Sequence, residues 1–484
     1  MSHAPLNIQV TPIKQKALCE LLNKSKTATE NLFNALFEKI AHKPWSLLLD
    51  TSESKKSDGR YNIMVFNPYR VVEAKNGEVF VTEPASKTSQ KVSEAPFEAT
   101  QKYLHSYIEG ARLSTSITPT QDLPFIVGVA GMAGYDTGRF YEVLPSQALG
   151  GYATPDYCVG LYLYSLIEDT HTGEFFYCSC DGSTFPTIFN EKNETEALDA
   201  FELTSSFSSN LTREQYTDRL TKIGHYLRAG DCYQVNMAQR FSATFKGNMW
   251  HAYSELRKQN QAPFSAYFCT PYGSVASISP ERFIKVKSGC IETKPIKGTR
   301  PRFEDPLADQ KSADSLLSAE KDRAENLMIV DLLRNDISKH CEPHTVKVPA
   351  LFALESYQAV HHLVSTVTGK LNKDASPLTL LASAFPGGSI TGAPKIRAME
   401  VIDELEPHRR NIYCGSIFYM GFREDMDSSI CIRTVLAENN TLYCWAGGGI
   451  VLDSDPADEY QETLDKVSKI IPVLSSLNNN LTEK

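Results

Sequence analysis

Short runs of alternating apolar and polar residues fill the amino-terminal half of the chain. In chain order they include WSLLLD (45–50), YNIMVF (61–66), GEVFVT (77–82), VGLYLYSLIED (159–169) and GEFFYCSC (173–180). A period of two places successive side chains on opposite faces of a strand, and turn residues separate these runs. The pattern therefore predicts a mostly antiparallel sheet in this half.

A helical period appears after about residue 210. In LTREQYTDRLTKIGHYLRAGD (211–231), Thr212 and Gln215 form a capping box, and Gly230 ends the helix. Between these signals, apolar residues recur at helical spacing: Tyr216, Leu220, Ile223 and Leu227. Strands and helices then alternate without a regular βαβ rhythm, so we expect an α+β fold with large antiparallel β-sheets.

Two polar stretches, 83–96 and 181–210, divide the chain. Both are rich in turn-forming and charged residues and show no apolar periodicity, so both are predicted to be poor in structure. The second is the better boundary. It separates an amino-terminal region, 1–190, from a carboxy-terminal region, 211–475.

Two predicted helices each carry acidic residues on one face. Apolar spacing predicts a helix over 318–336, in which Asp322 and Glu325 lie three residues apart. Asp455 caps the second helix and Pro456 takes its first position. Charged residues follow it at i, i+3 and i+7: Glu459, Glu462 and Lys466. One glutamate from each helix would suit Mg²⁺, which binds a few carboxylates together with water and ligand oxygens. The alternative is that both faces are simply solvated.

Two glycine-rich segments offer backbone amides to an anion. FPGGSITGAPKIRAME (385–400) runs from a loop into a helix, which leaves the amides around Thr391–Ala393 free. It fails the phosphate-loop pattern, because two residues separate Gly392 from Lys395. In CWAGGGIVLDSD (444–455), Gly447–Gly449 are followed by an apolar run rather than a helix, which excludes a dinucleotide fingerprint. Both segments suit a carboxylate, and the alternative for both is a tight turn.

The stretch ETKPIKGTRPR (292–302) places Lys297 in a predicted turn among the further cations Lys294, Arg300 and Arg302. A neutral lysine amine is a nucleophile, and neighbouring cations or burial favour the neutral form. Glu281 lies upstream at the near end of a strand pair, so a hairpin could bring it to Lys297 as an acid/base partner. The alternative is an ordinary solvated turn lysine.

The stretch AVHHLVSTV (359–367) is a predicted strand that places His361 and His362 on opposite sides. The two side chains therefore cannot chelate one metal together. One of them could face a cavity, and the alternative is a hydrogen-bonded core histidine.

Composition limits the partners of the chain. A net charge of -9 over 484 residues argues against nucleic acid or an anionic membrane as the main partner. No stretch approaches the length of an apolar membrane span, and we expect a cytoplasmic protein. The eleven cysteines show no CxxC pair, which makes a zinc site unexpected.

Taken together, the motifs resemble a known family. They are GDCYQVNMAQRF (230–241), SISPERF (277–283), PIKGTRPR (295–302), DRAENLMIVDLLRND (322–336), HHLVSTV (361–367), PGGSITGAPKIRAMEVIDELEP (386–407), CGSIFYMGF (414–422), CIRTV (431–435) and AGGGIVLDSDPADEYQET (446–463). In this order they resemble the chorismate-utilising enzymes of the anthranilate synthase component I family, and within it the aminodeoxychorismate synthase component I branch. The amino-terminal half resembles the family more loosely, through PWSLLLD, LPFIVGVAGMAGYDTGR and PDYCVGLY.

This resemblance implies an anthranilate-synthase-like sandwich of large antiparallel sheets with helices outside. It also implies a Mg²⁺-dependent reaction in which ammonia replaces the 4-hydroxyl of chorismate, giving 4-amino-4-deoxychorismate for p-aminobenzoate and folate. Such chains receive ammonia from a glutaminase subunit. Two alternatives remain: an anthranilate synthase component I, which carries alanine where Lys297 stands, and a non-catalytic regulator of the glutaminase that binds chorismate or tryptophan.

The resemblance also implies roles for individual residues. Glu325 and Glu462 match the magnesium ligands, supported by Asp322 and Glu459. Lys297 matches a nucleophile that forms a covalent adduct with the ring, Glu281 an acid/base, and His362 a histidine facing the ring. Gln234 stands where isochorismate-forming relatives have a lysine that activates water. The remaining positions are expected to bind the substrate: Gly298, Thr299, Thr391, Tyr413, Arg433, Gly447, Gly448, Gly449 and Lys466.

A pocket in the amino-terminal half resembles the site where relatives hold tryptophan, either as an inhibitor or as a built-in ligand. Its matching residues are Leu49, Thr51, Arg60, Tyr61, Pro263, Phe264 and Ser265. The match is partial, since relatives often have serine where Thr51 stands.

Overall fold

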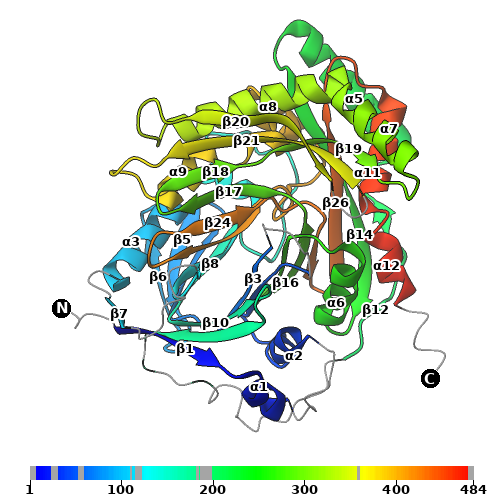
Figure 1. Cartoon of the computed structure of the whole chain (residues 1–484). Coiled ribbons are helices and arrows are strands. Elements are labelled where there is room, and N and C mark those ends of the chain that lie inside the picture. Colours follow the sequence, from blue (N-terminus) through cyan, green and yellow to red (C-terminus); the bar gives the residue numbers. More distant parts are fainter. Residues whose placement is uncertain are drawn as a thin grey trace.

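The computed structural model describes residues 7–22, 31–52, 59–108, 112–114, 123–180, 182, 185, 199–356 and 360–477. Within them two large β-sheets face each other and helices cover the outside (Figure 1). β-strands β1 (Asn7–Ile13) and β7 (Arg112–Ser114) pair in parallel. Neighbouring strands elsewhere, such as β14 (Gln234–Lys246) and β26 (Thr441–Ile450), run antiparallel. The predicted α+β fold with large antiparallel sheets is confirmed.

The first sheet has the order β12 (Glu202–Leu203), β14, β26, β25 (Thr434–Glu438), β16 (Gly273–Ser279), β15 (Phe264–Thr270), β2 (Leu47–Asp50), β3 (Tyr61–Val65), β10 (Tyr164–Asp169), β11 (Glu174–Ser179), β1 and β7, with β13 (Ser208–Ser209) and β22 (Gly392–Ala393) beside β14. The second has the order β19 (Ile296–Pro301), β21 (Val360–Lys370), β18 (Cys290–Thr293), β17 (Arg282–Lys287), β24 (Met426–Ser429), β23 (Ser416–Gly421), β8 (Gly128–Ala133), β9 (Tyr157–Tyr162), β4 (Arg70–Lys75), β5 (Glu78–Glu83) and β6 (Thr88–Val92), with β20 (Lys347–Ser356) beside β21.

The described helices are α1 (Gln15–Leu21), α2 (Leu32–Glu38), α3 (Pro96–Ile108), α5 (Arg213–Ala229), α6 (Met249–Asn260), α7 (Pro306–Leu317), α8 (Glu320–Ser338), α9 (Pro377–Ala384), α10 (Lys395–Leu405), α11 (Pro456–Val467) and α12 (Ile471–Ser476), together with the 3-10 turns η2 (Tyr135–Phe140) and η3 (Gly388–Ile390). In Figure 1, α8 crosses above β20 and β21, and α11 lies beside β14 and β26. None of the described helices is long and apolar enough to cross a membrane.

The local predictions from apolar period and caps are largely confirmed. The five alternating runs form β2, β3, β5, β9 with β10, and β11. The run 159–169 changes sheets, because β9 belongs to the second sheet and β10 to the first. Helix α5 has the predicted capping box, with the Gln215 amide 3.2 Å from the Thr212 hydroxyl, and Gly230 ends it at φ 83°.

Two local predictions are wrong. The stretch 83–96 is not poor in structure, because it contains β6, which pairs with β5. Its polar residues pair at an exposed sheet edge and so carry no apolar signal. Lys297 lies in β19 rather than in a turn. Of the polar stretch 181–210, only residues 182, 185 and 199–210 are described, and these include β12 and β13.

Both sheets contain strands from each side of the predicted boundary. In the first sheet β2 pairs with β15, and in the second sheet β8 pairs with β23. Residues 1–190 and 211–475 therefore share two continuous hydrogen-bonded sheets.

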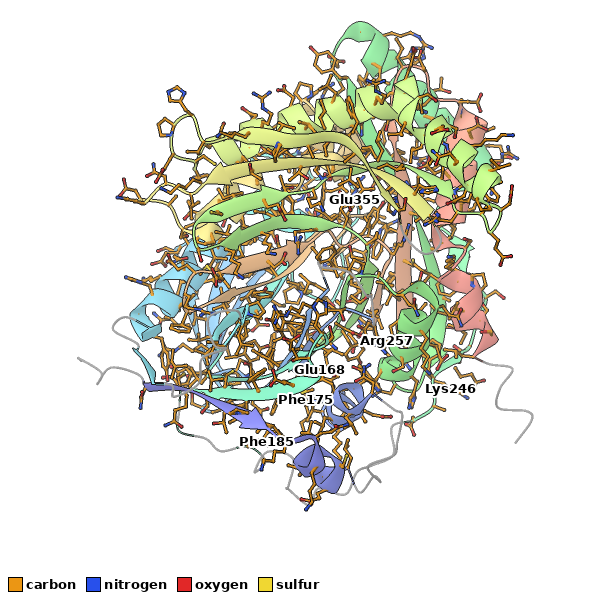
Figure 2. The ribbon with its side chains drawn as sticks, viewed as in Figure 1. Glu168, Phe175, Phe185, Lys246, Arg257 and Glu355 are labelled. Atoms are coloured by element: carbon orange, nitrogen blue, oxygen red, sulfur yellow. The ribbon has the colours of Figure 1, made fainter. Side chains whose placement is uncertain are left out.

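Apolar side chains form two cores. Figure 2 labels Phe175, which belongs to the smaller core. The larger one fills the space between the sheets, with Leu47 and Phe268 from the first sheet and Val286 and Ile417 from the second. The other lies between the outer face of the first sheet and helices α2 and α6, where Phe175 stacks on Phe33 at 6.4 Å. These cores hold the strand ends and helices that form the candidate site.

Candidate active site

Glu281 lies immediately before β17, and its side chain is buried. Burial raises the pKa of this carboxyl to about 7. Lys297, Lys466 and Arg433 all lie close enough to pull that pKa back down, and the Ser389 hydroxyl is 3.5 Å from Oε1. Three cations from separate parts of the chain therefore act on one buried carboxyl.

Lys297 sits at a β-bulge between β19 and β21. The register slips between Lys297 and Thr299, and Gly298 at the slip has φ 77°. A Cβ added to Gly298 would lie 2.8 Å from Leu316 Cδ1 and 2.9 Å from Asp322 Cγ, so only glycine fits here. The bulge explains why a strand of this sheet presents a lysine next to acidic residues.

Nζ of Lys297 forms no hydrogen bond or ion pair with any described residue, although the residue is half-buried. It is close enough to Glu281 and Glu325 to lower the pKa of both carboxyls. The amine is thus within electrostatic reach of both carboxyls and forms an ion pair with neither.

The other cations of the loop do not gather around Lys297. Lys294 pairs with Glu355 at 2.7 Å, Arg300 with Asp322 at 3.0 Å, and Arg302 with Asp309 at 2.8 Å. The sequence-based expectation that they would act together on Lys297 is wrong, because each has its own carboxylate partner.

His361 and His362 on β21 have separate partners, as their predicted orientation requires. His361 lies between the Ser356 hydroxyl at 2.8 Å and Asp309 at 3.0 Å, so both ring nitrogens have partners. Nδ1 of His362 is 2.9 Å from the hydroxyl of Thr299, beside the bulge. His362 is therefore tied to the segment that carries Lys297.

The acidic faces of α8 and α11 meet. Burial raises the pKa of Glu325, and the charges of Asp322 and Glu459 raise it further. Burial also raises the pKa of Glu459, and Glu462 adds to that rise. Lys466 pairs with Glu462 at 2.6 Å and donates to the Gly447 carbonyl at 2.7 Å. The alternative that both acidic faces are simply solvated is therefore wrong.

These carboxylates fit a divalent cation. Negative charge from two helices accumulates in a partly buried space, and the backbone at Gly448 approaches it so closely that a Cβ would lie 3.0 Å from Glu459 Oε2. Among the described residues, no group of three or more His, Cys, Asp or Glu side chains is arranged as a ready metal cage. Mg²⁺ needs only one or two carboxylates and keeps waters or ligand oxygens, so one glutamate from each helix fits it.

The three glycines of β26 lie opposite β14, where Gly447 pairs with Ala238 and Gly449 with Asn236. Strand β25 pairs with β26 only as far as Cys444. A Cβ at Gly449 would lie 2.3 Å from the Gln234 side-chain nitrogen. The Gln234 amide is fully buried, and neither its nitrogen nor its oxygen has a hydrogen-bond partner. A buried amide without partners is costly unless a ligand supplies them.

The loop before α10 differs from expectation at one point. The Thr391 amide donates to the Gly388 carbonyl at 3.4 Å, and its hydroxyl to the Gly387 carbonyl at 3.0 Å. Its amide is therefore not free for an anion, because η3 uses it. Instead Ser389, which the sequence did not single out, points its hydroxyl at Glu281. The only sequence feature that could have indicated Ser389 was its place in the glycine-rich motif.

Arg433 and Tyr413 complete the site. Arg433 has φ 52°, and its guanidinium forms no hydrogen bond or ion pair with the described residues. Burial lowers its pKa, and Glu281 opposes that shift. Tyr413 is buried and stacks on Trp445 with ring centres 6.0 Å apart. A half-buried cation that is not committed to a described carboxylate is suited to an anionic ligand.

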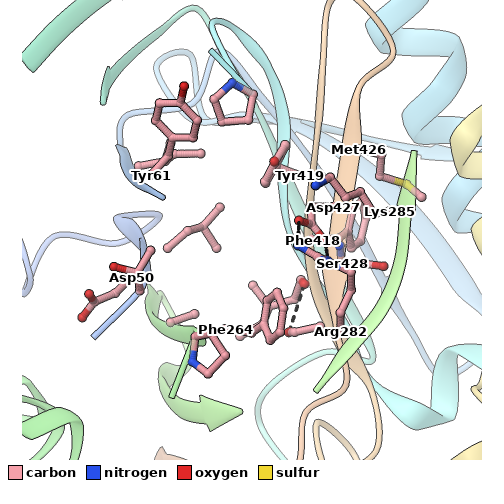
Figure 3. A pocket seen from close by; sticks show the side chains of 18 of the residues that line it. Asp50, Tyr61, Phe264, Arg282, Lys285, Phe418, Tyr419, Met426, Asp427 and Ser428 are labelled. Carbon is pink, nitrogen blue, oxygen red and sulfur yellow. Dashed lines mark hydrogen bonds and ion pairs between the residues drawn. The ribbon is translucent and has the colours of Figure 1, made fainter. Parts of the chain in front are cut away.

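A second candidate site is a cavity of about 280 Å³ (Figure 3), and Lys297 is not among the residues that line it. All seven residues of the predicted tryptophan pocket line it: Leu49, Thr51, Arg60, Tyr61, Pro263, Phe264 and Ser265. Arg282 lines the same cavity, stacks over Phe264 at 4.8 Å and pairs with Asp427 at 3.0 Å. Its neighbour Glu281 faces Lys297, so the two sites meet at adjacent residues.

Comparison with known proteins shows the family of this chain. The family model described as chorismate binding enzyme matches residues 48–472. The chain belongs to this family of chorismate binding enzymes.

Two groups of relatives show which members it is similar to. It is 45% identical over 440 residues to aminodeoxychorismate synthase component 1 of Klebsiella aerogenes, covering 91% of this chain and 96% of that protein. It is 32% identical to anthranilate synthase component 1 of Aquifex aeolicus, covering 97% and 98%. The solved anthranilate synthase component I of Streptococcus pneumoniae superimposes with a TM-score of 0.72 at 28% identity, covering 86% and 93%.

Proposed function

We propose that the chain replaces the 4-hydroxyl of chorismate with ammonia to give 4-amino-4-deoxychorismate, a precursor for p-aminobenzoate and folate. The observation that carries this proposal is the uncommitted amine of Lys297 between Glu281 and Glu325. The 45% identity to aminodeoxychorismate synthase component 1 supports the same activity.

Chorismate carries two carboxylates, and the site offers two cations for them. Arg433 is uncommitted, Lys466 pairs with Glu462, and both lower the pKa of Glu281. Tyr413 stacks on Trp445 of β26, the strand that also carries Gly447–Gly449. Glu325 and Glu462 would hold Mg²⁺, with Asp322 and Glu459 in support. The ion would neutralise and orient a substrate carboxylate.

In the proposed chemistry, Glu281 accepts a proton from the Lys297 ammonium. The freed amine attacks C2 of the ring, both conjugated ring double bonds shift, and the C4–O bond breaks. Glu281 returns its proton so that the 4-hydroxyl leaves as water. Ammonia then attacks C4 of the covalent adduct, both double bonds shift back, and the C2–N bond to Lys297 breaks. The ammonium formed at C4 gives one proton to the released Lys297 amine. One chorismate and one ammonia give one product and one water.

His362 and Gln234 would position the ring. His362 is fixed by Thr299 next to the nucleophile. Gln234 has a neutral amide without partners, which can hydrogen-bond the substrate or ammonia but cannot act as the base that isochorismate formation from water requires.

The test is to incubate the chain with chorismate, Mg²⁺ and an ammonium salt and to identify the product by mass spectrometry. Aminodeoxychorismate supports the proposal. Anthranilate would assign the chain to the other branch of the family, and the absence of any product would favour a regulatory binder.

We further infer that a glutaminase subunit supplies the ammonia, because the similar proteins are named as component 1. The chain alone should then use ammonium salts but not glutamine. Adding the glutaminase should make glutamine a substrate, and glutamine-dependent turnover by the chain alone would contradict this.

We also propose that the second cavity binds tryptophan. Phe264, Leu49 and Tyr61 offer apolar and aromatic surface for an indole, and Thr51 and Ser265 offer polar groups. Calorimetric titration with tryptophan tests this, and a Ser265→Trp variant that fills the cavity should abolish the heat of binding. Equal binding by that variant would contradict the assignment.

A further inference from the structure

Arg410 is the largest fully buried side chain of the described residues, at 1% exposure. It pairs with Glu406, with Nη2 2.6 Å from Oε1 and Nε 3.0 Å from Oε2. Burying a guanidinium is costly unless its donors are satisfied. The placement therefore needs a reason beyond the ion pair itself.

The remaining donors of Arg410 join two other chain segments. Nη1 donates to the Ile390 carbonyl at 2.9 Å, and Nη2 donates to the Asn236 carbonyl at 3.0 Å. Glu406 Oε1 in turn accepts from the Ala238 amide at 2.9 Å. The pair thus fixes β14 and the loop before α10 to each other through hydrogen bonds to the backbone.

Aromatic rings lie against the same guanidinium. The Tyr413 ring centre is 5.5 Å from it, and the Tyr135 ring centre is 4.8 Å from it. Tyr413 also stacks on Trp445 of β26. Three segments of the proposed site therefore touch Arg410, and they carry Gln234, Ser389 and Tyr413.

We propose that Arg410 is a positioning residue for chorismate, which sets the relative placement of β14, the loop before α10 and Tyr413 through one planar guanidinium. This inference rests on the proposed function, since those three segments form the proposed substrate site. A lysine would keep the charge, but it lacks the planar fork that spans two carbonyls and a carboxylate.

The test is the dissociation constant for chorismate with Mg²⁺ and without ammonia, by calorimetry. It uses the Lys297→Ala chain, which cannot form the adduct, with and without Arg410→Lys. We expect the second change to weaken binding about tenfold or more, because the segments shift relative to one another. Binding within about twofold by a folded Arg410→Lys chain would overturn the proposal.

Glu406→Gln covers the case in which Arg410→Lys does not fold. It keeps the shape and the acceptor for Ala238 but loses the charge that holds the guanidinium. We expect binding to weaken about threefold or more, and an unchanged dissociation constant would overturn the proposal.

Kinetics separate positioning from a loss of folded protein. A lower fraction of active enzyme reduces kcat and leaves KM for chorismate unchanged, whereas displaced binding groups raise KM. Arg257→Lys is the matched control, since Arg257 on α6 forms another buried ion pair, with Asp50. It should lose stability with KM for chorismate unchanged.

A wild-type chain that binds chorismate without aminating it would overturn only the proposed function, and a Lys297→Ala chain that binds none would overturn both.

Discussion

At the scale of single residues, the site depends on how burial changes ordinary side chains. A glutamate in water is an ordinary carboxylic acid, but burial raises the pKa of Glu281 to about 7, and the nearby cations limit that rise. A carboxyl with this pKa can both accept and return a proton near neutral pH. The uncommitted Lys297 amine is the group from which Glu281 would accept that proton.

The pH dependence follows from this pKa. Below pH 7 the Glu281 carboxyl is protonated and cannot accept a proton from Lys297. We therefore expect kcat/KM for chorismate to fall as the pH drops below about 7 and to level off above it. Glu281→Gln should lower the rate and remove this limb of the profile. A profile of unchanged shape in Glu281→Gln would assign the titration to another group.

Lys297→Ala should reduce 4-amination by about 10³-fold or more, because the covalent step is lost. We expect anthranilate as a residual product, since ammonia can then attack C2 directly. Lys294→Ala is the control in the same segment, because Lys294 pairs with Glu355 away from the amine, and it should change the rate little. Full 4-amination by Lys297→Ala would rule out covalent catalysis.

At the scale of elements, a bulge and two helices build the site. The bulge at Gly298 turns Lys297 toward α8, and α8 and α11 bring their acidic faces together. Neither feature depends on a single contact, and both can be disturbed separately.

Gly298→Ala tests the bulge. Gly298 and Gly289 have nearly the same φ, 77° and 76°, but a Cβ at Gly289 meets nothing within 4 Å. Gly289→Ala should therefore cost only the backbone strain, about 1 kcal/mol, while Gly298→Ala adds a clash with Leu316 and Asp322 and should cost about 2–4 kcal/mol. Chemical denaturation measures both, and equal costs would contradict the crowding at Gly298.

Mg²⁺ binding tests the two helices. Glu325→Gln removes one of the charges that repel each other, so without metal its melting temperature should equal or exceed that of the wild type. Mg²⁺ should raise the melting temperature of the wild type and have little effect on the variant. Asp331→Asn on the same helix is the control, since Asp331 is 79% exposed, and it should respond to Mg²⁺ like the wild type.

At the scale of the whole molecule, the two regions divided at 190–211 share both sheets. The β2–β15 and β8–β23 pairs cross that division. We expect one cooperative unfolding transition, followed by calorimetry and circular dichroism. Residues 211–484 expressed alone should not fold, because two strand edges and half of the core between the sheets would be exposed. Two separate transitions, or a folded fragment, would show independent domains.

Much of the local structure was predictable because its causes are local. The capping box at Thr212, the cap at Asp455 and the alternation in β2, β3 and β11 depend on neighbours in the chain. The edge strand β6 was missed because its residues are polar, and the strand around Lys297 because proline and glycine suggested a turn.

The chain itself determined which residue types were available: an isolated acid before β17, acidic pairs at helical spacing, a lysine before a glycine, and the family motifs in order. Only the tertiary structure decided which charges compensate one another, because that depends on distances between elements far apart in the chain. It paired Lys294, Arg300 and Arg302 with carboxylates, left Lys297 and Arg433 uncommitted, and raised the pKa of Glu281. Burial and charge proximity are properties of the packed molecule, so no local pattern could have specified them.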